Sequence, residues 1–141
     1  MDLEAGLSQA RALRLLGMAL VSVVFSGCIS YTEKEAEGMP DSDIALIGLT
    51  DKTLFIASVD GRKTNFALGT QTEYRLTAGR HRLELRYWVG TTKSLDRKIR
   101  DVNLVAGRTY KLTTAPSNTW WDMIIVDTSS GERVDQHVPR R

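Results

Sequence analysis

Apolar and polar residues alternate in short runs from Ile44 almost to the end of the chain. The clearest run spans 81–89, in which His81, Leu83, Leu85, Tyr87 and Val89 alternate with Arg82, Glu84, Arg86 and Trp88. A period of two is typical of a strand with one buried face. Less regular runs predict further strands over 44–50, 53–59, 62–68, 98–105, 108–114, 120–127 and 132–138.

Turn-forming residues separate these runs. Asp60-Gly61 is typical of a two-residue hairpin turn, because both central positions need positive φ. Short strands at such regular spacing predict an all-β fold. We expect a small antiparallel β-sandwich of about seven to eight strands over 44–138, with 132–138 at an edge.

The N-terminal segment has a different pattern. Leu15 to Ser26 is uncharged and mostly apolar, and Arg11 and Arg14 precede it. This run is too short to span a bilayer core of ~30 Å. A basic start, a short apolar run and small residues at its end are typical of a secretory signal. A buried N-terminal helix with a buried cysteine is the alternative interpretation.

The end of this segment, Ser26-Gly27-Cys28, resembles the bacterial lipobox, although Phe25 stands where that family usually has leucine. The resemblance implies that residues 1–27 are a signal peptide cleaved between Gly27 and Cys28, and that Cys28 carries the lipid. It also implies an outer-membrane location facing the periplasm, since Ile29 rather than aspartate follows the cysteine. Residues 28–43 are polar and contain Gly38 and Pro40, so we expect a tether linker there.

Several short motifs recur along the strand region. They are Val59-Asp60-Gly61, Leu76-x-Ala78-Gly79-x-His81-x-Leu83, Leu104-x-Ala106-Gly107-x-x-Tyr110 and Ile125-x-Asp127. Their order is similar to that of small PEGA-like sandwich domains over residues 54–127. That family usually has Pro-Gly before the histidine, where this chain has Ala78-Gly79. The resemblance implies a sandwich fold in an envelope protein and no particular activity.

Composition narrows the chemistry. The formal net charge is +2, and both signs are interspersed, so nothing predicts a nucleic-acid partner. The single cysteine cannot form an internal disulfide or a cysteine-based zinc site. The two histidines, His81 and His137, lie far apart, and His81 is expected to pack or form hydrogen bonds. We found no catalytic motif and expect no enzyme, cofactor or metal.

A surface of arginine and tryptophan is the candidate binding site. Arg82, Arg86 and Trp88 share the polar face of one strand, and Trp120 could join them. Exposed tryptophan beside arginine is typical of a protein or glycan contact, whereas packing of Trp88 on a sheet edge or a loop is the alternative. We therefore expect a lipid-anchored envelope protein that binds another envelope protein or a polymer. The alternatives are a structural subunit pairing through 132–138 and an enzyme that acts on wall glycan.

Overall fold

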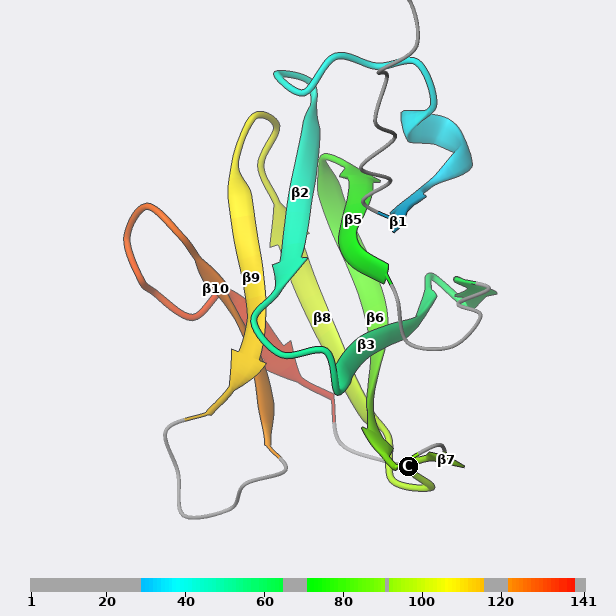
Figure 1. The fold of residues 1–141 in the computed structure, drawn as a ribbon. Coiled ribbons are helices and arrows are strands. Elements are labelled where there is room, and N and C mark those ends of the chain that lie inside the picture. Colours follow the sequence, from blue (N-terminus) through cyan, green and yellow to red (C-terminus); the bar gives the residue numbers. More distant parts are fainter. Residues whose placement is uncertain (1–28, 65–70, 91, 116–121, 139–141) are drawn as a thin grey trace, which may run out of the picture.

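The computed structural model describes residues 29–64, 71–90, 92–115 and 122–138. Two β-sheets lie face to face (Figure 1). The strands are β1 (Ile29–Thr32), β2 (Ile44–Leu49), β3 (Leu54–Val59), β4 (Arg62–Lys63), β5 (Gln71–Thr77), β6 (Gly79–Val89), β7 (Thr92–Lys93), β8 (Lys98–Leu104), β9 (Thr109–Thr114), β10 (Met123–Asp127) and β11 (Asp135–His137). A single short 3-10 helix, η1 (Lys34–Ala36), accompanies them in this part of the chain. The all-β sandwich predicted from the sequence is confirmed.

The strands are divided between a five-stranded and a six-stranded sheet. The first sheet has the order β1-β5-β2-β9-β10, and the second has the order β11-β8-β6-β3-β4, with β7 paired to β6. Antiparallel pairs dominate, but β1 with β5 and β2 with β9 are parallel. The described residues thus form more strands than the seven or eight expected, because β1, β5 and β7 fall outside the predicted runs.

The core lies between the two sheets. It is built mainly from side chains at alternate strand positions, which are Ala45, Ile47, Leu54, Ile56, Val59, Tyr74, Leu76, Leu83, Leu85, Val102, Leu104, Tyr110, Leu112, Met123 and Ile125. Leu83 and Leu85 of β6 are fully buried, as the alternation of 81–89 predicted. Glu84 and Arg86 alternate with these two leucines along β6, so their side chains point to the outer face of the sheet.

The predicted hairpin turn is present between β3 and β4. Asp60 and Gly61 both have positive φ, at 50° and 81°, and Val59 pairs with Arg62 across the turn. The partner strand is shorter than expected, since β4 ends at Lys63 rather than continuing to Leu68. Residues 65–70 lie outside the described residues.

The segment 28–43, expected to be a tether linker, contains regular structure where it is described, namely β1 and η1. Ile29–Thr32 is the edge strand β1, which pairs in parallel with β5. In Figure 1, β1 and η1 lie beside β5. Tyr31 packs against Tyr74 with ring centroids 6.0 Å apart, and Ala36 is 1% exposed. A polar composition concealed this strand, because only its long-range pairing supplies buried contacts for Tyr31.

The C-terminal segment closes one side of the sandwich. Its backbone bonds first to β10, where the Val134 N–H donates to Ile125 O at 2.9 Å. Its last part, β11, then pairs with β8 in the opposite sheet. The edge position expected for 132–138 is confirmed for β11, which is shorter than predicted. Among the described residues, no helix has the length and apolarity needed to cross a membrane.

Candidate functional site

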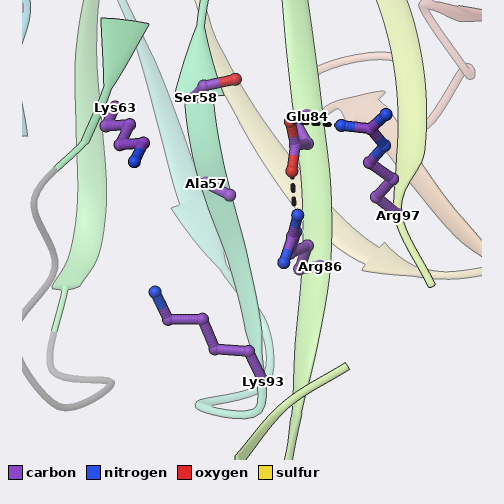
Figure 2. Close-up of a pocket in the computed structure, with 7 residues that line it drawn as sticks. All are labelled: Ala57, Ser58, Lys63, Glu84, Arg86, Lys93 and Arg97. Atoms are coloured by element: carbon purple, nitrogen blue, oxygen red, sulfur yellow. Dashed lines mark hydrogen bonds and ion pairs between the residues drawn. The ribbon is translucent and has the colours of Figure 1, made fainter. Parts of the chain in front are cut away.

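A hollow of about 430 Å³ lies on the outer face of the second sheet. It is lined by Ala57, Ser58, Lys63, Glu84, Arg86, Lys93 and Arg97, which come from β3, β4, β6, β7 and the segment before β8 (Figure 2). These residues are brought together by the pairing of β3 with β4 and with β6. The hollow is therefore a product of the sheet and not of one continuous segment.

The floor of the hollow consists of small side chains. Ala57 is the extra residue at a register shift in the pairing of β3 with β6, and Ser58 is the next residue that pairs. Such a bulge twists the strand locally and redirects its side chains. Larger residues surround this floor, so the surface is concave here.

Positive charge dominates the hollow. Four of its lining residues are cations, namely Lys63, Arg86, Lys93 and Arg97, against the one carboxylate of Glu84. In Figure 2, Glu84 lies between Arg86 and Arg97, while Lys63 and Lys93 enter from the other side. The lining thus has a formal excess of three positive charges.

Glu84 orders the two arginines of the hollow. Its carboxylate oxygens lie 2.7 Å from Arg86 Nε and 3.9 Å from Arg97 Nη1. Glu84 thus contacts both guanidinium groups of the lining, and guanidinium groups are donors that bind anions. The Ser58 hydroxyl is a further polar group in the lining of the hollow, and Figure 2 shows it on β3 next to Ala57.

The predicted partner surface is only partly assembled in this way. Arg86 lines the hollow, whereas Arg82 donates from Nε and Nη2 to both carboxylate oxygens of Asp101, at 2.7 and 2.9 Å. This hydrogen bonding lowers the pKa of the Asp101 carboxyl below its ordinary value. Trp88 is half-buried, with its ring centroid 5.1 Å from that of Phe55. Trp88 thus packs against the neighbouring strand β3, and not on a sheet edge or a loop as the alternative interpretation had it.

Other residues of the sequence prediction cannot be placed. Trp120, Gly27 and Cys28 lie outside the described residues. Conversely, Lys63, Lys93 and Arg97 belong to the hollow but were not among the candidates. Lys93 and Arg97 lie in a stretch that has the sequence pattern of a polar loop, and nothing in their order indicates that they face Arg86.

A second polar group lies where β3, β5 and β6 meet the N-terminal segment. His81 Nδ1 is 2.7 Å from Asp60 Oδ2, and its Nε2 is 2.8 Å from the Thr77 carbonyl oxygen. Glu33 Oε2 accepts from the Thr77 N–H at 2.9 Å and from the Thr77 hydroxyl at 2.8 Å. The expectation that His81 forms hydrogen bonds is confirmed.

Asp122, just before β10, and Asp127, the last residue of β10, both pair with arginines. Asp127 Oδ2 accepts from Arg108 Nη1 at 2.8 Å, and Asp122 Oδ1 accepts from Arg100 Nη2 at 2.8 Å. Hydrogen bonds from the Ser129 side chain and then from Arg108 hold the pKa of Asp127 far below its ordinary value. β10 belongs to the first sheet, whereas the strands that line the basic hollow belong to the second sheet. These two carboxylates are therefore not part of the hollow.

Comparison of the chain with protein-family models, with curated proteins and with solved structures gave no match. The function is therefore inferred from the basic hollow, from the group formed by Glu33, Asp60 and His81, and from the sequence pattern at Cys28.

Proposed function

We propose that this protein is a non-enzymatic, lipid-anchored envelope protein whose basic hollow binds an anionic group on an envelope polymer. The observation that carries the binding role is the excess of cations in the hollow, four against one carboxylate. Arginine and lysine donors are the groups that recognise carboxylates and phosphates. A concave surface lets several of them contact one anionic group at once.

The hollow is suited to binding and not to proton transfer. Its one carboxylate, Glu84, is held against Arg86 at 2.7 Å, and no second carboxylate of the described residues lines the hollow. Lys63 and Arg97 are exposed and can adjust to the shape of a polymer. An enzyme that acts on glycan would instead need two carboxylates across a cleft.

The anchor rests on the sequence, in which Ser26-Gly27-Cys28 ends a short apolar segment. In this proposal the lipidated residue comes directly before Ile29, the first residue of β1. The sandwich would then lie against the bilayer without a spacer. The partner polymer must accordingly be within the reach of the domain itself.

The alternative of a structural subunit that pairs through 132–138 has less support. Part of that segment already bonds within the sandwich, since the Asp127 N–H donates to Glu132 O at 2.9 Å and β11 pairs with β8. The backbone groups used in these bonds cannot also pair with another chain.

Binding can be tested with two labelled probes, poly-L-glutamate and polyphosphate, which separate a carboxylate polymer from a phosphate polymer. We expect one of them to bind with an affinity that falls as salt rises. Lys63→Glu combined with Lys93→Glu should weaken binding about tenfold or more, because both lysines line the hollow.

The matched control is Lys52→Glu combined with Lys111→Glu, which changes net charge equally on exposed lysines outside the hollow. The control should bind nearly as well as the unchanged chain. Equal weakening by both double variants, or no binding of either probe, would contradict the binding role.

The anchor needs its own test. Cells that express the full chain should incorporate a palmitate analogue into it, and globomycin should cause the unprocessed form to accumulate. Cys28→Ser should abolish the label and release the protein from membranes. An unlabelled chain, or a serine variant that stays membrane-bound, would contradict the anchor and leave the binding test unaffected.

A further inference from the structure

Glu33, Asp60 and His81 come from three separate segments, yet each offers a ligand atom within 4.8 Å of the other two. Glu33 precedes η1, Asp60 lies in the turn after β3, and His81 is on β6. One imidazole nitrogen and two carboxylate oxygens form a donor set that zinc accepts. We infer that Glu33, Asp60 and His81 form a binding site for one divalent transition-metal ion of the Zn²⁺ type.

The orientation of His81 suits this role. Its Nε2 faces the Thr77 carbonyl oxygen at 2.8 Å, an atom that can only accept a hydrogen bond. Nε2 therefore donates a hydrogen bond to that carbonyl, and Nδ1 is the ring nitrogen that faces Asp60 Oδ2. Histidine ligands in metal sites are commonly held in this way, with the remote ring N–H on a carbonyl or carboxylate.

The carboxylates are held in place from outside the site. Two hydrogen bonds from Thr77 fix Oε2 of Glu33, whose residue is 4% exposed. The Arg82 N–H donates to Oδ1 of Asp60 at 2.7 Å, which leaves Oδ2 facing His81. The backbone of β5 and β6 thus positions one oxygen of each carboxylate.

The separations are close to those that one ion requires. With metal–ligand distances of roughly 2.0–2.2 Å, two ligand atoms of a tetrahedral ion lie about 3.3–3.6 Å apart. The three ligand atoms all lie within 4.8 Å of one another, so rotation of the side chains has to bring them closer around an ion. In the other direction, Nδ1 and Oδ2 are only 2.7 Å apart and must separate slightly. Binding replaces any proton on Nδ1, which is released to solvent.

The surroundings admit a cation. The Asp60 side chain is 37% exposed, and it lines a second hollow of about 390 Å³ together with Arg80, His81, Arg82 and Asp101. Arg82 is already neutralised by Asp101. The ligand group itself brings two carboxylates, those of Glu33 and Asp60, to this corner of the sandwich.

Equilibrium dialysis of the full chain against Zn²⁺, with metal analysis, tests the inference. We expect one saturable ion per chain. Asp60→Asn and Glu33→Gln should each weaken binding at least tenfold, because each removes a charged ligand. His137→Gln removes the other histidine of the chain and should leave binding unchanged.

A second measurement covers the case in which His81→Gln fails to fold. In ¹⁵N spectra of the imidazole rings, Zn²⁺ should shift Nδ1 of one histidine, and that signal should survive in the His137→Gln variant. The absence of saturable binding would overturn the inference and leave the three residues as a hydrogen-bonded structural group. Binding that is lost in His137→Gln, or retained in both carboxylate variants, would also overturn it.

Discussion

Arg100 and Asp135 form a buried ion pair that joins β8 to β11. Arg100 Nε lies 3.0 Å from Asp135 Oδ2, and the two side chains are 3% and 0% exposed. Asp135 also accepts from the Ile125 N–H of β10 at 2.7 Å, so one carboxylate connects both sheets. Desolvated charges of this kind are stable only while each keeps its partner.

Replacing Arg100 with alanine should lower the free energy of unfolding by about 3–5 kcal/mol, because it removes the buried cation that contacts both Asp135 and Asp122. Urea denaturation followed by circular dichroism measures this. The control is Arg133→Ala, since Arg133 contacts the same carboxylate at 3.0 Å but its side chain is 43% exposed. That control should lose only about 0–1 kcal/mol. Equal losses would show that burial does not govern this pair.

Tyr74 should make stability fall at alkaline pH. Burial raises the pKa of its hydroxyl from 10.0 to about 12. A raised pKa in the folded state favours the neutral form, so its contribution is complete below about pH 10 and is lost as pH rises towards about 12. Unfolding free energies measured across this range, with tyrosinate absorbance recorded in parallel, should show the decline.

Tyr74→Phe separates the titration from the packing. The Ile56 N–H donates to the Tyr74 hydroxyl oxygen at 3.0 Å in the core, so the variant leaves a buried donor without its acceptor. We expect a loss of about 1–3 kcal/mol that does not grow with pH. A variant with the same alkaline decline as the unchanged chain would rule out Tyr74 as its source.

Tyr31 tests whether the N-terminal segment belongs to the sandwich. Its ring packs on Tyr74 and on the core, so Tyr31→Ala should cost about 1–3 kcal/mol of unfolding free energy. Ser30→Ala, at the exposed neighbouring position, should change it by less than about 0.5 kcal/mol. If neither variant shifted the unfolding midpoint, 29–32 would behave as the tether that its composition suggested.

Gly107 and Gly131 give a matched test of a close backbone contact. Both have φ in the left-handed region, at 75° and 72°. A Cβ at Gly107 would lie 3.2 Å from the Ser42 carbonyl oxygen, whereas one at Gly131 would meet nothing within 4 Å. Each alanine substitution should cost about 1–2 kcal/mol for the backbone alone, and Gly107→Ala should cost more. Thermal unfolding of the two variants compares them, and equal costs would argue against a rigid contact with Ser42.

Local patterns were enough to predict the class of fold. The alternation of 81–89 corresponds to β6, with Leu83 and Leu85 buried. Asp60-Gly61 adopts the predicted turn, with positive φ at both residues. These features depend on the side-chain period of a strand and on the φ preferences of the turn residues, and both are encoded within a few neighbouring positions.

The candidate sites depend instead on strand pairing. Arg86 is a residue of the sequence prediction that lines the hollow, but Lys63, Lys93 and Arg97 meet it only because β4, β7 and the segment before β8 lie around β6. Glu33 reaches Asp60 and His81 because β1 pairs with β5, a strand that the periodicity of the sequence did not predict. The sequence by itself determined the sandwich and its main hairpin, and the proposed anchor at Cys28 rests on the sequence alone. Only the tertiary structure decided which charges share a surface, because contacts between distant segments follow from pairing and packing and leave no periodic signal along the chain.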